Sequence, residues 1–301
     1  MLALVGPTAT GKSDVSIGVA SAMGAEVLCA DAMTVWRGLE IGTAKPSEAQ
    51  RSFVRHHLLD LFEPGSRPTV ANFADEAASV VAAVTARGAR SLVVGGSGLY
   101  VRAVVDGLRF PPTDAALRAE LEVLPPDEVV RRLRALDPGS FEHVDPANTR
   151  RVVRALEITL LTGVPASQQR ESWTQRADLP IVGLDLPDDA LARRIATRTA
   201  SMLGAGWVEE CRGFDAQDRR ADVLSTQALG YREIFQVIDG ELSSAEAEDR
   251  IVHATLKLAK RQRTWFRADP RVHWIDAGDL ESATTAAIEI FQAAGAAPRH
   301  T

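Results

Sequence analysis

The chain has 301 residues, of which 46% are hydrophobic and 25% charged, and its formal net charge is −6. This composition is ordinary for a globular protein, and the acidic balance argues against a protein that coats nucleic acid, although a local basic patch can still bind a phosphate backbone. No run of about 18 apolar residues occurs, and the first residues lack the basic segment and cleavage site of a signal peptide. We therefore expect a cytoplasmic protein without a membrane span.

In the first third of the chain, short apolar runs alternate with segments of helical periodicity. We assign three strands, at residues 2–5, 26–30 and 91–94. We assign three helices, at residues 14–23, 73–87 and 98–105. Gly88 ends the second helix, as a glycine after a helical segment commonly does. This alternation of strands and helices predicts a parallel sheet wrapped by helices.

The pattern changes after Phe110, where two prolines follow and no strand candidate occurs between residues 114 and 175. We assign helices there at residues 117–124, 127–136 and 148–162. Strand patterns return at residues 180–186 and 272–275, and helical patterns at 190–202, 207–214 and 245–266. We therefore predict an α/β core domain formed by residues 1–113 and 178–301, interrupted by an all-helical insertion at residues 114–177.

Cysteine and histidine are too sparse to predict a metal site. The two cysteines, Cys29 and Cys211, lie far apart in the sequence and have no Cys-x-x-Cys spacing. This argues against a disulfide framework and a structural zinc site, and it favours a reducing compartment. His56 and His57 are adjacent and would point to opposite sides of a strand or helix, so we expect structural roles for both.

The strongest motif follows the first strand. It fits G-x-x-x-x-G-K-[ST] at every fixed position and consists of Gly6, Pro7, Thr8, Ala9, Thr10, Gly11, Lys12 and Ser13. In such a loop, backbone N–H groups and the following helix N-terminus surround phosphate oxygens. Lys12 would add a positive charge, and Ser13 a hydroxyl ligand for Mg²⁺. We therefore predict binding of a di- or triphosphate with Mg²⁺, but the loop does not decide the reaction.

The second candidate for the chemistry is Asp31. P-loop ATPases and GTPases usually carry a further strand that ends in a metal-binding aspartate, whereas the strand at 91–94 is followed by Gly95, Gly96 and Ser97. Asp31 stands at the end of the strand after the P-loop helix, and strand carboxyl ends line the ligand crevice of α/β sheets. From its position alone, Asp31 either faces the reacting group or caps the next helix.

Several segments, in order along nearly the whole chain, resemble the tRNA dimethylallyltransferase (tRNA isopentenyltransferase) family. The matching segments are residues 6–13, 31–46, 56–60, 95–100, 150–157, 227–231 and 260–267. The run Ile-Gly-Thr-Ala-Lys-Pro that ends at Pro46 is far more specific than a P-loop. The resemblance implies a P-loop NTPase-like parallel sheet flanked by helices, with an all-helical insertion that binds tRNA. The sequence lacks the C-terminal zinc finger of eukaryotic members, which implies the bacterial type.

The resemblance implies transfer of a dimethylallyl group from dimethylallyl diphosphate to the exocyclic N6 of the adenine next to the anticodon (position 37), in tRNAs that read codons beginning with U. The product is N6-dimethylallyladenosine. Asp31 would accept the hydrogen of N6, which is a poor nucleophile because its lone pair is delocalised into the ring. Lys12, Ser13 and Mg²⁺ would neutralise the leaving diphosphate. Thr8 and Arg212 match positions directed at the prenyl diphosphate.

The resemblance also implies a set of tRNA-binding residues. Its members are Asp31, Ala32, Met33, Thr34, Ser97, Arg118, Arg150, Arg151 and Arg154. Ser97 matches a catalytic position where the family usually has threonine, and both residues supply a hydroxyl. Ala32, Thr34 and Trp36 depart from the usual residues on the base-binding side, whereas the charge-handling groups are intact. In the family the tRNA is read largely by shape and the target base is flipped out. Nothing in the sequence indicates an obligate dimer, so we expect a monomer.

Three other functions share part of this pattern. A small-molecule kinase would also use the P-loop, but it does not explain the long match outside that loop. An adenylate isopentenyltransferase acts on free AMP, ADP or ATP and lacks much of the helical insertion, which is present here. A P-loop module that binds RNA without turnover is disfavoured by the intact Lys12, Ser13 and Asp31. Trp265 and Phe266 either stack on RNA bases or pack on the sheet, and packing is slightly favoured.

Overall fold

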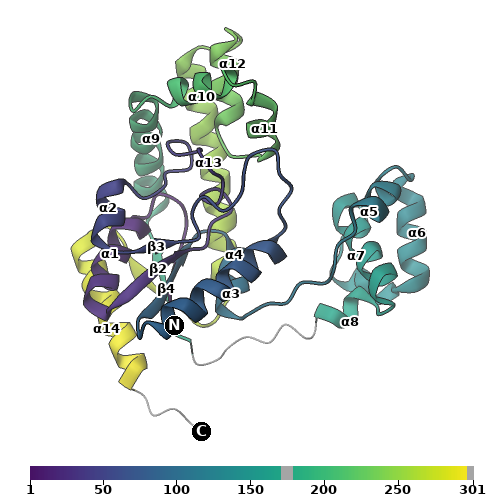
Figure 1. The fold of residues 1–301 in the computed structure, drawn as a ribbon, viewed down its shortest axis with the longest axis horizontal. Coiled ribbons are helices and arrows are strands. Elements are labelled where there is room, and N and C mark those ends of the chain that lie inside the picture. The colour runs from purple at the N-terminus through teal and green to yellow at the C-terminus, as the bar shows by residue number, and fades with distance from the viewer. Residues whose placement is uncertain (171–178, 297–301) are drawn as a thin grey trace. The chain divides into compact units, whose positions relative to one another are not determined.

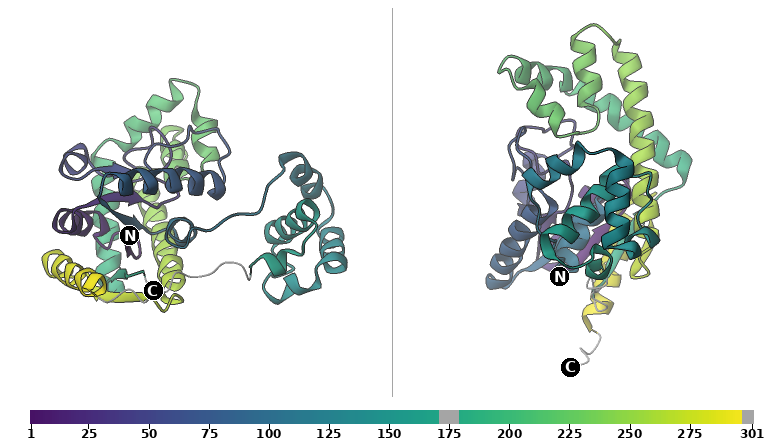
Figure 2. Two further views of the ribbon diagram at one scale, coloured as in Figure 1. Left: turned by 60° about the horizontal axis from the view of Figure 1, so that its bottom comes forward. Right: turned by 90° about the vertical axis from the view of Figure 1, so that its right-hand side faces the viewer.

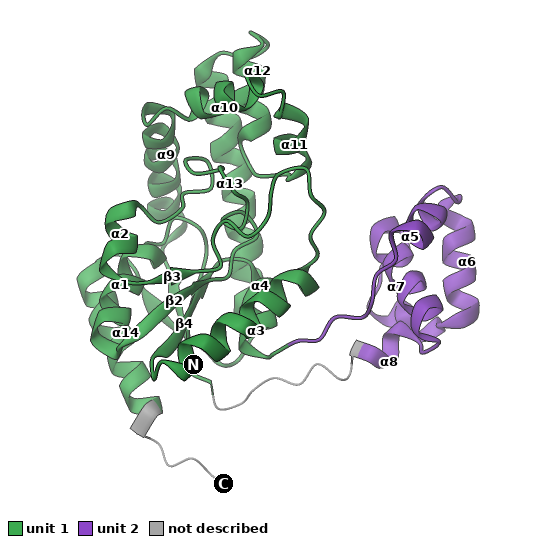
Figure 3. Ribbon diagram, viewed as in Figure 1, with its two compact units in different colours: residues 1–107, 177–301 green, residues 108–176 purple. Residues whose placement is uncertain are grey.

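The structure is a computed structural model that describes residues 1–170 and 179–296. The chain divides into two compact units, the first formed by Met1–Gly107 and Ala177–Thr301 and the second by Leu108–Arg176 (Figure 3). The boundaries expected from the sequence, at residues 113 and 178, lie close to these. No helix in the described part of the chain is long and apolar enough to cross a membrane.

The first unit is built on a sheet in which six strands of the described residues run parallel (Figure 1). They are β1 (Leu2–Val5), β2 (Ala25–Cys29), β3 (His56–His57), β4 (Arg90–Gly95), β5 (Ile181–Asp185) and β6 (Val272–Asp276). The strand order is β3-β2-β4-β1-β5-β6. This confirms the predicted α/β fold with a parallel sheet. The sequence missed β3 because two histidines do not make an apolar run.

Helices cover both faces of this sheet. On one face α1 (Lys12–Met23) packs against α14 (Leu280–Ala296). The other face is covered by α3 (Val70–Ala86), α4 (Gly98–Val105) and α13 (Ser244–Arg267). The central strands are buried on both sides, so that Leu4, Leu92 and Leu184 are fully inaccessible to solvent. Such runs of buried aliphatic residues are typical of parallel strands.

A second group of helices lies beyond the sheet. It comprises α2 (Glu48–Phe53), α9 (Asp188–Gly204), α10 (Trp207–Asp215), α11 (Arg220–Ser225) and α12 (Tyr231–Ile238). The 24-residue helix α13, yellow-green in Figures 1 and 2, runs from α12 to the sheet and also contacts α9 and α4. It therefore connects the outer helices with the helices that cover the sheet.

The second unit contains only helices among its described residues. They are α5 (Ala115–Glu122), α6 (Pro126–Leu136), the 3-10 helix Pro138–Glu142, α7 (Thr149–Thr162) and α8 (Ala166–Arg170). Local signals explain their limits: the Asp114 side chain accepts hydrogen bonds at the start of α5, and Gly163, with φ 68°, ends α7. Leu133, Val152 and Leu156 form a separate small core. Residues 171–177 of the predicted insertion lie outside the described residues.

Candidate active site

Three loops meet at the carboxyl ends of the neighbouring strands β2, β4 and β1. The loop after β1 is the P-loop, Asp31 lies just beyond β2, and Ser97 lies just beyond β4. Close approach of these loops requires glycine, because a Cβ atom at Gly95 would collide with the carbonyl oxygen of Ala30, and one at Gly96 with the amide of Gln262. The parallel sheet thus gathers segments far apart in sequence at one crevice, where α/β folds bind ligands.

The P-loop has the backbone shape of a phosphate cradle. Gly6 and Gly11 adopt φ angles of 142° and 90°, and Ala9 adopts a left-handed φ of 64°. The buried Thr10 hydroxyl donates to the carbonyl oxygen of Pro7 at 2.9 Å and holds the turn closed. Successive right- and left-handed residues ahead of a helix N-terminus direct backbone N–H groups towards one concavity. The loop is therefore shaped to surround an anion.

Lys12 lies inside this loop in an unusual electrostatic setting. Its Nζ donates to the carbonyl oxygen of Pro7 at 2.6 Å. Burial lowers the pKa of Lys12 to about 8. The charge of Arg198 also lowers this pKa, whereas the Asp31 carboxylate raises it. A buried ammonium without a full counter-charge is stabilised by a bound anion. The site therefore favours a ligand with negative charge next to Lys12.

Two side chains from helices remote in sequence complete the cradle. Arg198 of α9 donates to the Thr8 hydroxyl at 3.1 Å, and Gln262 of α13 accepts from the Thr8 backbone N–H at 2.8 Å. Arg194, one turn before Arg198, donates to the carbonyl oxygens of Ala277 and Gly278 at 2.9 and 3.0 Å and so anchors α9. Burial lowers the pKa of Arg198, against the effect of the Asp31 carboxylate. The cradle thus carries a second, partly buried cation.

Asp31 is held in place by its own loop and by Ser97. One Asp31 carboxylate oxygen accepts from the backbone N–H of Met33 at 2.8 Å, and the Ser97 hydroxyl accepts from the N–H of Ala32 at 3.0 Å. The Asp31 charge acts on Lys12, on Arg198 and on Tyr100, whose pKa is raised by burial and by this carboxylate. Asp31 therefore shares one site with the two cations of the cradle.

These residues line one cavity of ≈ 720 Å³. Lys12, Ser13, Asp31, Ser97 and Arg198 are all on its wall. Two further wall residues carry buried polar atoms without a hydrogen-bond partner among the described residues, the Thr34 hydroxyl and the Trp207 indole N–H. Buried donors are normally satisfied, so these two groups are exceptions among the residues of the wall.

The Ile-Gly-Thr-Ala-Lys-Pro segment forms part of this wall and is fixed from two directions. A Glu210 carboxylate oxygen accepts from the N–H groups of Glu40 and Ile41 at 3.1 and 2.8 Å, and Tyr231 donates to the other oxygen at 2.7 Å. Lys45 has a fully buried ammonium that donates to the carbonyl oxygen of Trp36 and pairs with Glu40 and Asp60. This packing ties the segment to the outer helices α10 and α12.

The indole of Trp207 occupies the space that two glycines leave free. A Cβ atom at Gly42 or at Gly230 would overlap its ring, and Tyr231 contacts the ring edge-on with centroids 5.5 Å apart. Gly42 belongs to the Ile-Gly-Thr-Ala-Lys-Pro segment and Gly230 to the matching segment at residues 227–231. Both segments therefore shape the cavity around one tryptophan, which the sequence alone did not single out.

Half of the residues expected from sequence to bind diphosphate or tRNA line this cavity. The cavity wall includes Thr8, Ala9, Gly11, Lys12, Ser13, Asp31, Met33, Thr34 and Ser97. Arg212 is not on this wall: it lies exposed on α10 and pairs with Glu209 at 3.2 Å. Arg198 is the arginine at the P-loop instead. Its signal was a pair of arginines one turn apart on the helix after β5, but only the strand order shows that β5 lies beside β1.

The four arginines expected to bind tRNA lie in the second unit and fall into two pairs. Arg118 and Arg154 both reach the fully buried carboxylate of Glu157, at 2.6 and 2.7 Å. Burial acts to raise the pKa of Glu157, but hydrogen bonds from both arginines outweigh it and lower that pKa. Arg150 and Arg151 are exposed in the first turn of α7. The first pair thus has a structural role, while the second is presented to solvent.

No cluster of three or more histidine, cysteine, aspartate or glutamate side chains that could hold a metal occurs within residues 1–170 and 179–296. His57 contacts Glu26 at 2.6 Å and His56 contacts the carbonyl oxygen of Val54 at 2.7 Å. Cys29 and Cys211 are free and buried. A metal at the P-loop would therefore take Ser13 and ligand oxygens, a donor set that suits Mg²⁺.

The neighbouring aromatic residues near the end of α13 differ in burial. Phe266 is buried in the core, whereas Trp265 is half exposed and its indole lies against Gly98, directly after Ser97. Only Phe266 thus has a purely packing role.

Comparison with known proteins agrees with this geometry. Residues 34–269 match the family model described as IPP transferase. The chain belongs to the IPP transferase family. It is 41% identical over 300 residues to a tRNA dimethylallyltransferase of Kocuria rhizophila, covering 97% of this chain and 95% of that protein. It is 43% identical to one of Acidothermus cellulolyticus, covering 96% of this chain and 93% of that protein.

Two solved structures have a similar fold. The tRNA isopentenylpyrophosphate transferase of Bacillus halodurans superposes with a TM-score of 0.72 at 34% identity, covering 97% of this chain and 95% of that one. A eukaryotic dimethylallyltransferase acting on tRNA superposes with a TM-score of 0.86 at 23% identity, covering 100% of this chain and 81% of that one. The second likeness shows the fold alone. Both agree with a six-stranded parallel sheet flanked by helices.

Proposed function

We propose that this IPP transferase family member transfers a dimethylallyl group from dimethylallyl diphosphate to the exocyclic N6 of the adenine next to the anticodon (position 37) of tRNA. The product is N6-dimethylallyladenosine, in tRNAs that read codons beginning with U. The observation that carries the proposal is the joining of a cationic diphosphate cradle and the Asp31 carboxylate in one cavity. The names of the relatives support the same reaction.

The cradle suits a diphosphate leaving group. Lys12, Arg198 and the helix N-terminus of α1 place positive charge around the P-loop. As the bond between the allylic carbon and the diphosphate oxygen breaks, its electron pair stays on that oxygen. Fixed positive groups at this oxygen stabilise the developing charge more than they stabilise the bound substrate. Arg198 therefore takes the diphosphate-binding role that the resemblance gave to Arg212.

Asp31 acts on the nucleophile. The N6 lone pair forms the new bond to the allylic carbon, and N6 then carries a surplus proton. A carboxylate that accepts the N6–H hydrogen bond keeps electron density on N6 and takes up this proton. Ser97 acts with Asp31, because its hydroxyl holds the Ala32 N–H and so fixes the loop that carries the carboxylate.

Mg²⁺ would be held by the Ser13 hydroxyl and the diphosphate oxygens, and it would supply further neutralisation of the leaving group. Lys12 contributes to holding the diphosphate on the P-loop, because its Nζ already lies within the loop. Because the cradle would bind the diphosphate and Asp31 would bind N6, the reacting carbon would lie between them.

The helical unit supplies tRNA contacts. Arg150 and Arg151 present two exposed guanidinium groups on the first turn of α7, where arginine binds phosphate oxygens well. Arg118 and Arg154 shape that surface through Glu157. The proposed tRNA-binding set consists of these four arginines and of Asp31, Ala32, Met33, Thr34 and Ser97. The enzyme would act in the cytoplasm, where its tRNA substrate is, and the proposed reaction needs no second copy of the chain.

A transfer assay tests this function. Labelled dimethylallyl diphosphate and Mg²⁺ are offered with unmodified tRNA and free AMP in the same reaction, and ATP consumption is measured in a parallel reaction that contains ATP. Label entering tRNA alone is the expected result. Label entering AMP alone would identify an adenylate isopentenyltransferase, and consumption of ATP with no label in either acceptor would identify a kinase.

A further inference from the structure

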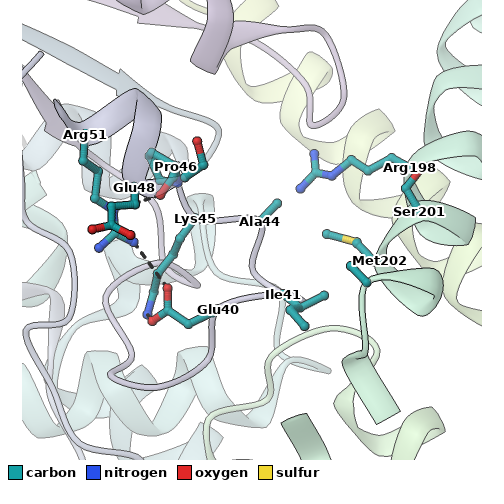
Figure 4. Close-up of a pocket in the computed structure, with 12 residues that line it drawn as sticks. Glu40, Ile41, Ala44, Lys45, Pro46, Glu48, Arg51, Arg198, Ser201 and Met202 are labelled. Carbon is teal, nitrogen blue, oxygen red and sulfur yellow. Dashed lines mark hydrogen bonds and ion pairs between the residues drawn. The ribbon is translucent and has the colours of Figure 1, made fainter. Parts of the chain in front are cut away.

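A second cavity of ≈ 700 Å³ adjoins the reaction cavity on the side of α2 and α9 (Figure 4). The two cavities share four wall residues, namely Ala44, Pro46, Arg198 and Met202. These four residues therefore form the boundary between the two spaces. Of the four, Met202 has the longest and most flexible apolar side chain.

The position of Met202 on α9 relates it to the diphosphate cradle. Arg198 and Met202 are four residues apart and lie on the same face of the helix, and both line the reaction cavity. The rise of an α-helix separates them by about 6 Å along the axis. Arg198 donates to Thr8 of the P-loop, so it marks the diphosphate end of the donor. Met202 then lies one helical turn beyond the residue that marks the diphosphate end.

The space beyond Met202 has an apolar side. Ile41, Ala44 and Ala205 line it with Met202, whereas the opposite rim carries Lys45 and Arg51. Figure 4 shows Met202 and Ile41 apart from the Lys45–Glu40 pair. Lys45 is already paired with Glu40 and Asp60, and Arg51 with Glu40. The rim cations are thus engaged, and the apolar side is the part that suits a hydrocarbon chain.

We propose that Met202, which lines the boundary together with Ala44, limits the prenyl donor to a single five-carbon unit. The inference rests on the proposed function and adds to it a residue that determines donor chain length. With Met202 shortened, the second isoprene unit of a ten-carbon donor would enter the second cavity along Ile41 and Ala205. The reaction itself is unchanged: the allylic C–O bond breaks, the C–N6 bond forms, diphosphate leaves with the electron pair, and N6 gives up one proton.

Competition between donors tests the proposal. Dimethylallyl and geranyl diphosphate are mixed with one tRNA, and the ratio of the two modified nucleosides is measured by mass spectrometry. The wild-type chain should transfer dimethylallyl almost exclusively. Met202→Ala should raise the geranyl share by about 10- to 100-fold, the range that a changed apolar pocket provides. Because both products come from one enzyme preparation, partial misfolding does not alter the ratio.

Two controls isolate the role of Met202. Met202→Leu keeps the side-chain volume and should keep the wild-type ratio. Ser201→Ala changes a neighbour on α9 that lines only the second cavity, and it should also leave the ratio unchanged. If Met202→Ala gives an inactive protein, Met202→Val is measured instead. Valine shortens the side chain at the boundary by less than alanine does, and it should also raise the geranyl share of the product.

The experiments distinguish failure of the proposed function from failure of the proposed role of Met202. If wild-type protein transfers no dimethylallyl group to tRNA, the proposed function is wrong. If it does, and Met202→Ala retains that transfer with an unchanged product ratio, then Met202 does not set donor length. Efficient geranyl transfer by the wild-type chain would also overturn the inference.

Discussion

The hydroxyl of Ser97 accepts a hydrogen bond from the backbone N–H of Ala32 at 3.0 Å, and this bond joins the end of β4 to the loop that carries Asp31. The two residues are 65 positions apart in the chain. The bond leaves the Ser97 O–H free to donate, so the hydroxyl can contact the substrate while it positions the catalytic loop. A side-chain hydroxyl is needed here, whereas the extra methyl of threonine is not.

Two substitutions of Ser97 should therefore distinguish the effect of the hydroxyl on turnover from the effect of side-chain size. Ser97→Ala removes the acceptor for the Ala32 N–H, which costs about 1 kcal/mol, and turnover should fall about five- to tenfold. Ser97→Thr restores the hydroxyl and should restore turnover. Steady-state kinetics with saturating donor measures both. Equal turnover rates for the alanine and threonine variants would show that the Ser97 hydroxyl has no role in the mechanism.

Asp31→Asn tests the carboxylate without changing its shape. The amide cannot accept the N6 proton, so turnover should fall by about 10²- to 10⁴-fold, while tRNA affinity in a filter-binding assay stays close to that of the wild type. Asp14→Asn is the matched control, since Asp14 is also on the cavity wall but bonds to Gln50. Unchanged turnover in Asp31→Asn would rule Asp31 out as the proton acceptor.

The lowered pKa of Lys12 predicts a pH limit on donor binding. In the free protein this pKa is about 8, and a bound diphosphate raises it, so the donor binds best when Lys12 is protonated. Above about pH 8, kcat/KM for dimethylallyl diphosphate should fall by up to tenfold for each pH unit. Lys12→Ala should lower kcat/KM at neutral pH and lose this descending limb. A flat wild-type profile between about pH 7 and 9.5 would contradict the assignment.

Glu157→Gln tests the structural role of the arginine pair in the helical unit. The change leaves Arg118 and Arg154 without their shared buried counter-charge. The free energy of unfolding should fall by about 2–3 kcal/mol. This is less than for a fully buried ion pair, because both arginines are partly exposed. Chemical denaturation measures this. Glu128→Gln removes exposed pairs with Arg131 and Arg132 and should change stability little. Equal effects of the two substitutions would contradict the structural role.

The exposed pair Arg150 and Arg151 should instead affect tRNA binding. Replacing each arginine with alanine removes about one phosphate contact, so the slope of log affinity against log salt should become less steep by about 0.7–0.9 for each. Arg131→Ala, an exposed arginine of the same unit, is the control. If tRNA binding of the double variant keeps the wild-type salt dependence, α7 does not contact the tRNA backbone.

Local sequence patterns were sufficient to predict much of the fold and the centre of the site. The P-loop motif and the apolar runs mark β1, β2, β4 and α1 directly, since both are properties of short segments. The strand β3 was missed, because its two histidines pair with β2 only through tertiary context. The helices α11, α12 and α14 were also not assigned from the sequence.

The remaining site residues depend on long-range packing. Arg198 reaches the P-loop because β5 lies next to β1, an order that no local pattern records. Trp207 reaches the cavity wall because glycines at two distant positions leave room for its ring. The pairing of Arg118 and Arg154 with Glu157 likewise follows from the packing of α5 on α7. In each case the sequence shows the residue itself, but it does not show which distant residue that side chain contacts.

The most direct test of the central claim is to map the modified base. Two transcripts of one tRNA that reads a codon beginning with U are compared, one with adenine next to the anticodon and one with guanine there. Each is incubated with the protein, dimethylallyl diphosphate and Mg²⁺, then digested to nucleosides for mass spectrometry. The account predicts one adenosine heavier by one isoprene unit in the first transcript and none in the second. An isoprene unit on both transcripts, or on neither, would contradict it.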